Sequence, residues 1–219
     1  SSFMIKNYVQ NILHKSFGVF MEKQIAVAMG LEKADLVLKG GNVINVYTGE
    51  VEVADIAISD GIIAGIGNYC GKTEVNVQGK YLSPGFIDGH LHIESTMLSP
   101  SNFAKAVLPW GTTTGICDPH EIANVCGEAG VDYMIKESKI VPFDAMFMAP
   151  SCVPATPYEN NGATIDADGL DKLLEKCHGV GEFMNAPGVI YRDSDVMNKL
   201  KYARKRGVVV DGHYPLAGE

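Results

Sequence analysis

The chain has 219 residues, 46% of them hydrophobic, so it is long enough to bury a sizeable core. Its 26 acidic residues outnumber its 18 Lys and Arg residues, and the net charge of -8 argues against a nucleic-acid-binding surface. No apolar stretch reaches the roughly 18 to 20 residues of a membrane-spanning helix, and the five cysteines form no Cys-x-x-Cys pair. We therefore expect a cytoplasmic protein that binds a small molecule and has no nucleic-acid or membrane partner.

The N-terminal part of the sequence divides into two predicted segments. Residues 1–30 repeat apolar side chains at helical spacing and end at Gly30, which predicts a helical extension. Residues 31–83 change to short β-rich runs that are separated by Gly-Gly, Thr-Gly and Asp-Gly pairs. This second pattern predicts a small β-sandwich segment built from antiparallel strands.

Residues 84–219 alternate strand-like and helical patterns, which is typical of the α/β class with parallel strands. Apolar runs recur about every thirty residues: GFIDGHLH, TTTGICD, DAMFMAP, GVGEFMN and GVVVDGH. No glycine-rich dinucleotide-binding turn follows the first run, so a doubly wound sheet is disfavoured. The pattern instead favours the first five units of a (β/α)₈ TIM-type barrel, whose reactive groups stand at the C-terminal ends of the strands.

The first of these strand ends carries two histidines, His90 and His92, one residue apart. Alternate residues of a strand point to the same face, so the two imidazoles can bind one divalent cation, or they can simply hydrogen-bond to nearby backbone. Glu182 follows from the fourth predicted strand and His213 from the fifth, where both can turn toward the same point. Four nitrogen and oxygen donors at the ends of three strands predict a divalent-metal site.

The second strand end adds Asp118, His120 and Glu121, in the segment CDPHEIANVCG. Asp118 stands before a proline and is a good start for a turn, and His120 and Glu121 can open the following helix as first-turn residues. The same side chains would also stand beside a pocket at this face of a barrel. The residues alone leave the turn-forming and the active-site interpretations open.

Several segments resemble the adenine deaminases of the amidohydrolase superfamily, from about residue 34 to the last residue: PGFIDGHLHIEST, LPWGTTTGICDPHEIANVCG, MAPSCVPATPYE, VGEFMNAPGV and DGHYP. The first of them marks only the superfamily, whereas DPHEIANV, APSCVPAT and GEFMN in that order are more specific. The resemblance implies that the substrate is adenine, which a metal-activated hydroxide would hydrolyse to hypoxanthine and ammonia.

The resemblance also implies a binuclear metal centre. Its ligands would be the four strand-end donors, His90, His92, Glu182 and His213, with the Glu182 carboxylate bridging the two cations. Manganese or iron suits such nitrogen and oxygen ligands best, and zinc is the alternative.

The second-strand motif would lie in or beside the pocket in such an enzyme. Asp118, His120 and Glu121 are therefore candidate catalytic residues. The leaving amine needs a proton, and Glu121 or His120 could supply it as the acid/base group.

One departure from the resemblance concerns the length of the chain. A complete site would take a further histidine from a sixth strand and an aspartate from an eighth, and neither strand falls within the 219 residues. We therefore expect a truncated chain that has no deaminase activity by itself. Its open strand edges favour assembly with other copies, as a homo-oligomer.

Two other functions are compatible with the same residues. One is an amidohydrolase that acts on a cyclic amide or on a different aminopurine, and the other is a non-catalytic metal-binding fragment. A zinc deaminase of the cytidine type is disfavoured, because the His92-Ile93-Glu94 match is not followed by Pro-Cys-x-x-Cys.

Overall fold

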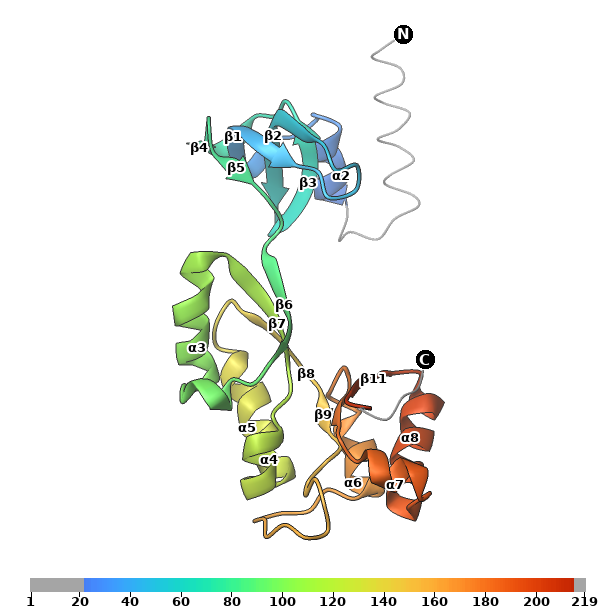
Figure 1. The fold of residues 1–219 in the computed structure, drawn as a ribbon. Helices are drawn as coiled ribbons and strands as arrows, with labels where there is room; N and C mark the ends of the chain where they lie inside the picture. Colours follow the sequence, from blue (N-terminus) through green and yellow to red (C-terminus); the bar gives the residue numbers. More distant parts are fainter. Residues whose placement is uncertain (1–21, 215–219) are drawn as a thin grey trace. The chain divides into compact units, whose positions relative to one another are not determined.

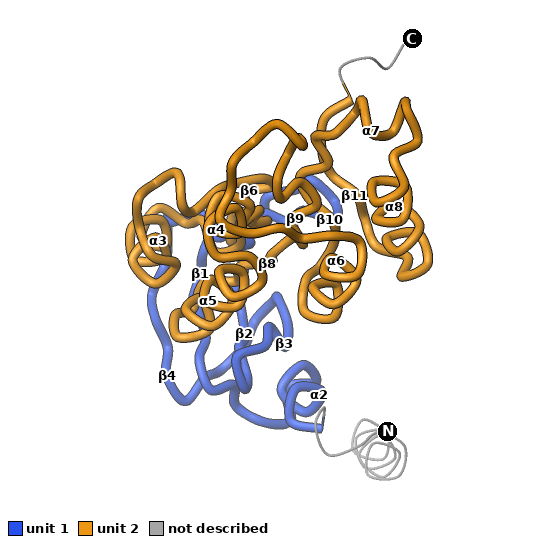
Figure 2. The backbone as a smooth tube through the Cα atoms, turned by 90° about the horizontal axis from the view of Figure 1, so that it is seen from below, with its two compact units in different colours: residues 1–84 blue, residues 85–219 orange. Residues whose placement is uncertain are grey.

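The computed structural model describes residues 22–214, which form two units divided between Pro84 and Gly85 (Figure 2). Most of the helical extension predicted over residues 1–30 lies outside the described residues, and its described part contains the short helix α2, Glu22–Ala28. Among the described residues, no helix is long and apolar enough to cross a membrane.

Unit 1 is built around a five-stranded sheet in the order β3-β2-β1-β4, with β5 also paired to β1 (Figure 1). Its strands are β1 (Ala34–Ile44), β2 (Val51–Ser59), β3 (Ile62–Gly67), β4 (Gly71–Asn76) and β5 (Tyr81–Leu82). The β1–β2 and β2–β3 pairs are antiparallel, whereas β4 and β5 run parallel to β1. The prediction that all strands of this segment are antiparallel is therefore wrong. Where a β-sandwich is expected over residues 31–83, the described residues form one mixed sheet.

Two pairs that resemble turn signals in the sequence, Asp60-Gly61 and Gly40-Gly41, differ in the structure. Asp60 and Gly61 both have positive φ (51° and 76°) in the tight turn between β2 and β3, as a type I′ hairpin requires. Gly40, in contrast, lies inside β1 with φ of 69°, where the register to β2 shifts between Leu38 and Gly41. An irregularity of this kind is a β-bulge, so the chain continues along the same strand instead of turning back.

Charged groups tie α2 to the sheet of unit 1. Asp35 in β1 accepts hydrogen bonds from Lys23 of α2 at 2.7 Å and from Lys72 of β4 at 2.9 Å. The backbone N–H of Asp60 donates to the same carboxylate at 3.0 Å. These donors, with Lys23 contributing most, hold the pKa of Asp35 well below its ordinary value.

Unit 2 contains two three-stranded sheets, β6-β7-β8 and β11-β10-β9, and all of their strand pairs are parallel (Figure 1). The strands are β6 (Phe86–Leu91), β7 (Thr112–Cys117), β8 (Asp144–Phe147), β9 (Ala149–Pro150), β10 (Gly179–Phe183) and β11 (Val209–Gly212). Met148 alone separates β8 from β9, so the chain passes directly from one sheet into the other.

Helices connect the successive strands of unit 2, with the exception of β8 and β9, in keeping with the alternation that the sequence predicts. They are α3 (Pro100–Val107), α4 (His120–Cys126), α5 (Glu128–Ser138), α6 (Ala167–Leu173), α7 (Ala186–Ile190) and α8 (Ser194–Arg206), with short 3₁₀ turns at Glu94–Thr96 and Leu108–Trp110. The longest, α8, is capped at its start by the Asp193 carboxylate, which accepts from the N–H of Val196, and it ends at Gly207 with φ of 67°.

A single apolar core fills the space between these helices and the strands. Phe147, Met134 and Leu170 are among its fully buried side chains, and they come from β8, α5 and α6. Burial of such side chains removes apolar surface from water and fixes the strands in place. The polar residues at the strand ends therefore stand on a packed scaffold.

Candidate metal centre

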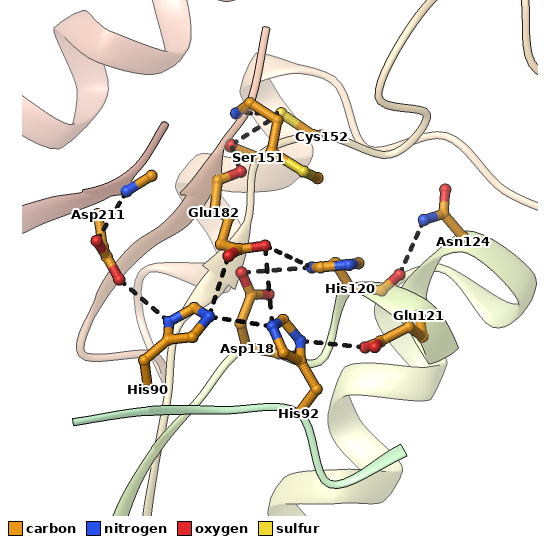
Figure 3. A network of polar contacts seen from close by, with 12 residues as sticks. His90, His92, Asp118, His120, Glu121, Asn124, Ser151, Cys152, Glu182 and Asp211 are labelled. Atoms are coloured by element: carbon orange, nitrogen blue, oxygen red, sulfur yellow. Dashed lines mark hydrogen bonds and ion pairs between the residues drawn. The ribbon is translucent and has the colours of Figure 1, made fainter. Parts of the chain in front are cut away.

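The C-terminal ends of parallel strands in unit 2 bring polar side chains to one place (Figure 3). They lie in β6, β10 and β11, directly after β6, β7 and β11, and in the first turn of α4: His90, His92, Asp118, His120, Glu121, Glu182, Asp211 and His213. Parallel strands end at the same edge of a sheet, which is why residues distant in the sequence meet here.

Glu182 lies at the middle of this group, and only 7% of it is exposed. Its Oε1 lies 3.0 Å from Nε2 of His90 and 3.0 Å from Nε2 of His213. Its Oε2 lies 3.6 Å from Nδ1 of His120 and 3.8 Å from Nε2 of His92. Each carboxylate oxygen thus faces two imidazoles, an arrangement in which one carboxylate can serve two cations.

The charge of Glu182 is favoured by these neighbours. Burial acts to raise the pKa of the carboxyl group, but the hydrogen bond with His213 and the fields of His90 and His92 outweigh burial. The pKa of Glu182 therefore lies below its ordinary value, and at neutral pH the group is a carboxylate, as a metal ligand must be.

The ring of His92 presents a lone pair to the same centre. Its Nδ1 lies 3.0 Å from the backbone carbonyl oxygen of Asp118, which can only accept a hydrogen bond, so Nδ1 carries the proton. Nε2 is then unprotonated, and it lies 3.0 Å from Nε2 of His90 (Figure 3). A cation placed between nitrogen lone pairs and the Glu182 carboxylate would be held by all of them.

The second-strand motif also reaches the centre. Asp118 is only 1% exposed, yet within the described part of the chain neither of its carboxylate oxygens has a hydrogen-bond partner. Nδ1 of His120 lies 3.5 Å from Oδ2 of Asp118, and this carboxylate raises the pKa of His120 above its ordinary value. Glu121 accepts a hydrogen bond from Ser95 at 2.8 Å and places its other oxygen 3.3 Å from Nδ1 of His92.

A test of fit is whether these side chains are arranged for a cation. Three overlapping groups have one ligand atom from each member within 4.8 Å of the others: His90-His92-Glu182, His92-His120-Glu121 and Asp118-His120-Glu182. Buried carboxylate oxygens without a hydrogen bond are costly unless a cation or a proton compensates them. The donors are all nitrogen and oxygen, the set that suits manganese, iron or zinc. The residues present therefore fit a divalent-metal centre.

The backbone of Glu182 is held by a chain of buried polar contacts. The hydroxyl of Ser151 donates to the carbonyl oxygen of Glu182 at 2.8 Å. The ammonium group of Lys199, a residue of α8, donates to the carbonyl oxygen of Ser151 at 2.9 Å and also pairs with Asp195. This arrangement connects α8 to the strand that carries Glu182.

Two members of this neighbourhood are absent from the sequence-based candidates. Asp211 places Oδ2 3.2 Å from Nδ1 of His90. Ser151 supports Glu182 through the hydrogen bond already described. The alternation of a strand gives a signal for Asp211, because Asp211 and His213 are two residues apart and share a face. Nothing in the spacing of Ser151 distinguishes it from other loop residues.

The comparisons with known proteins agree with this picture. The model of the amidohydrolase family matches residues 81–219. The adenine deaminase of Clostridium acetobutylicum is 51% identical over 197 residues, which are 89% of this chain and 35% of that protein. The adenine deaminase of Halalkalibacterium halodurans is 46% identical over 198 residues, 88% of this chain and 34% of that protein. The chain thus spans about a third of the length of these curated relatives.

Solved structures share the fold at much lower identity. A D-hydantoinase (dihydropyrimidinase) from Thermus sp. is 21% identical, with a TM-score of 0.57, over 81% of this chain and 40% of that one. An N-acyl-D-glutamate deacylase from Bordetella bronchiseptica, solved with zinc and a phosphonate inhibitor, is 16% identical, with a TM-score of 0.53, over 83% of this chain and 45% of that one. The family model covers more than half of the sequence and includes every residue of the candidate centre, so this chain belongs to the amidohydrolase family.

Proposed function

We propose that this chain is the metal-binding first part of an adenine deaminase. The observation that carries the proposal is the Glu182 carboxylate, whose two oxygens face His90 and His213 on one side and His92 and His120 on the other. Relatives that are 51% and 46% identical carry the name adenine deaminase. In this proposal unit 2 supplies the first five units of a (β/α)₈ barrel, with β8 and β9 as one interrupted strand.

The proposed centre is binuclear, and its ligands from this chain are His90, His92, Glu182 and His213. Manganese or iron is the proposed metal, with zinc as the alternative. When bound, the cations would supply Lewis-acid activation of a water molecule at neutral pH.

The proposed role of the second-strand motif is to hold and transfer protons. Deamination at C6 of a purine turns the amino group into ammonia, so a proton must reach the leaving nitrogen. Nδ1 of His120 and Oε2 of Glu121 make no hydrogen bond within residues 22–214, although each lies within ion-pair distance of a neighbour. Both are proposed to exchange a proton with the substrate. Nδ1 of His120 faces the Asp118 and Glu182 carboxylates together, so both hold the same edge of the ring.

We further propose a cytoplasmic homo-oligomer with adenine as its small-molecule substrate. The strands β6 and β11 each form one edge of a sheet in unit 2. Both carry exposed apolar side chains that support assembly with another chain: Phe86, Ile87, Val209 and Val210. Edge strands with such side chains are sites where another strand can pair.

A chimeric enzyme tests the proposed function directly. The part of the Clostridium acetobutylicum adenine deaminase that matches this chain would be replaced by it, and the purified chimera would be loaded with Mn²⁺. We expect conversion of adenine to hypoxanthine, followed by the absorbance change and by ammonia release. The same chimera with Glu182→Gln should lose this activity, and the parent enzyme provides the positive control.

Two outcomes would contradict the proposal. Ring opening of hydantoin or dihydropyrimidine without deamination of adenine would indicate a different amidohydrolase. A folded chimera that binds Mn²⁺ but converts none of these substrates would indicate a metal-binding protein without catalysis.

A further inference from the structure

Among the described residues, Asp211 contacts the candidate metal centre through His90. Its Oδ2 lies 3.2 Å from Nδ1 of His90, and its Oδ1 accepts the backbone N–H of Gly212 at 2.8 Å (Figure 3). Both oxygens of this carboxylate therefore have a polar contact, although 46% of the side chain is exposed.

The local structure of β11 explains why Asp211 reaches His90. The register between β10 and β11 is irregular between Val180 and Phe183, where Gly212 lies opposite Phe183. A Cβ atom on Gly212 would come within 2.4 Å of the backbone nitrogen and oxygen of Phe183, so only glycine permits this approach. Beyond it, the N–H of His213 donates to the carbonyl oxygen of Phe183 at 2.9 Å. Asp211 and His213, on either side of Gly212, are thereby both directed to the centre.

His90 faces a different carboxylate at each ring nitrogen. Nδ1 faces Asp211 at 3.2 Å, and Nε2 faces Oε1 of Glu182 at 3.0 Å. Nε2 also lies 3.0 Å from Nε2 of His92, so a proton on Nε2 has two acceptors, whereas Asp211 is the acceptor at Nδ1. A neutral imidazole has one N–H, so Asp211 competes with Glu182 and His92 for that proton. A proton on Nε2 would donate to Glu182 and would block the nitrogen that faces the centre, whereas a proton on Nδ1 leaves Nε2 free as a ligand.

We infer that Asp211 is a positioning residue that holds the proton of His90 on Nδ1 and so keeps Nε2 available for a metal ion. The inference deepens the proposed function, because it rests on the proposed metal centre. His92 obtains the same tautomer from the backbone carbonyl of Asp118, which no side-chain substitution removes. His90 depends on a side chain, so its tautomer can be altered by mutation.

Two variants and a control test this role. Asp211→Ala removes the acceptor, and Asp211→Asn keeps the shape but leaves one amide oxygen for two donors, Gly212 N–H and His90 Nδ1–H. Asp144→Ala is the matched control, because it removes an exposed carboxylate from β8 in the same unit. All would be made in the 219-residue chain, with folding checked by circular dichroism.

The first measurement is the nitrogen NMR spectrum of the imidazole rings in the metal-free chain, with His90 assigned through His90→Gln. We expect a larger share of the Nδ1–H tautomer of His90 in the wild type and the control than in both Asp211 variants, which should shift toward Nε2–H because Nε2 faces Glu182 and His92. An unchanged His90 signature in Asp211→Ala would overturn the inference, because a merely structural role would leave the tautomer as it is.

The second measurement is Mn²⁺ affinity by competition with a fluorescent chelator. We expect Asp211→Ala to weaken binding roughly 10- to 100-fold, the usual effect of losing a carboxylate that orients a metal-bound histidine, and Asp144→Ala to leave it unchanged. Equal affinity of Asp211→Ala and wild type would overturn the inference. Absence of Mn²⁺ binding by the wild type would instead contradict the proposed metal centre, and the NMR result would still decide the role of Asp211.

Discussion

The ammonium group of Lys199 lies 2.9 Å from the carbonyl oxygen of Ser151, although only 6% of this lysine is exposed. Lysine is rarely buried to this extent unless its charge is paired, and here Asp195 lies 2.9 Å away as the partner. Ser151 in turn donates to the carbonyl oxygen of Glu182. A helix on the outside of the sheet is thus connected to the residue at the middle of the candidate centre.

Replacing this lysine should destabilise the chain. Lys199→Met leaves the carbonyl oxygen of Ser151 buried without its donor, so we expect the free energy of unfolding to fall by about 1 to 3 kcal/mol. Urea denaturation would measure the change. Lys201→Met is the control, because Lys201 is exposed on the same helix and a surface change of this kind stays within about 0.5 kcal/mol. Equal loss in the two variants would contradict the structural role of Lys199.

Removing the charge of Glu182 should abolish tight metal binding. Glu182→Gln keeps the shape but presents an amide NH₂ group to one pair of imidazoles, so we expect Mn²⁺ affinity to fall by roughly 100-fold or more, since ligand charge is a main determinant of affinity. Calorimetric titration of the 219-residue chain would measure the fall. Glu52→Gln removes an exposed carboxylate from β2 and should bind as wild type does. Retention of wild-type affinity by Glu182→Gln would exclude Glu182 as a ligand.

Acid should weaken unit 1 through Asp35. The folded-state pKa of this carboxyl group lies below its unfolded value of about 3.9, so its contribution to stability is present above that pH and is lost as the pH falls toward the folded-state pKa. The urea midpoint of the wild type should therefore drop below pH ~4, and Asp35→Asn should be less stable at neutral pH and show a smaller drop. A parallel pH profile for the two proteins would show that Asp35 is not responsible.

The cysteines should react with alkylating reagents in two classes. Burial raises the pKa of Cys117 and Cys177 to about 12, so their thiolate forms are scarce in the folded chain at pH 8. Cys152 is buried as well, whereas Cys70 and Cys126 are exposed. We expect iodoacetamide to label the two exposed cysteines in the native chain and all five in guanidinium chloride, as read by peptide mass spectrometry. Rapid native labelling of Cys117 would contradict the packing of β7.

Much of unit 2 can be predicted from its sequence because its strands and helices have strong, regular hydrophobic patterns. The short helix α7 has no such pattern and was not predicted, whereas α4 was expected only as one of two interpretations of His120 and Glu121. α7 contains a proline and a glycine, and it is stabilised by Asn185, whose side chain accepts from the N–H of Gly188 at 2.8 Å. A local cap of this kind depends on geometry rather than on periodicity. In unit 1 the parallel pairing of β4 with β1 joins strands distant along the chain, which no local pattern encodes.

The residues of the candidate centre likewise differ in how far the sequence predicts them. The histidines and the glutamate at strand ends could be predicted as ligands from the sequence. Their side chains bind metal ions, and the reactive groups of a barrel stand at the C-terminal ends of its strands. Strand alternation places Asp211 on the same face as His213, but it indicates no partner for the Asp211 carboxylate. Its contact with His90, 121 residues earlier in the chain, arises only in the folded structure, so the structure was needed to find it.

The donors of the centre are divided between the two sheets of unit 2: His90 and His92 belong to β6 and its end, and Glu182 and His213 to β10 and the end of β11. A cation held by both sets would act as a non-covalent cross-link between the sheets. Neither sheet could then unfold without releasing the ion, so the stability of unit 2 would rise with free metal, by about 2.7 kcal/mol at a concentration 100 times the dissociation constant. The melting temperature of the chain would therefore report the occupancy of the centre.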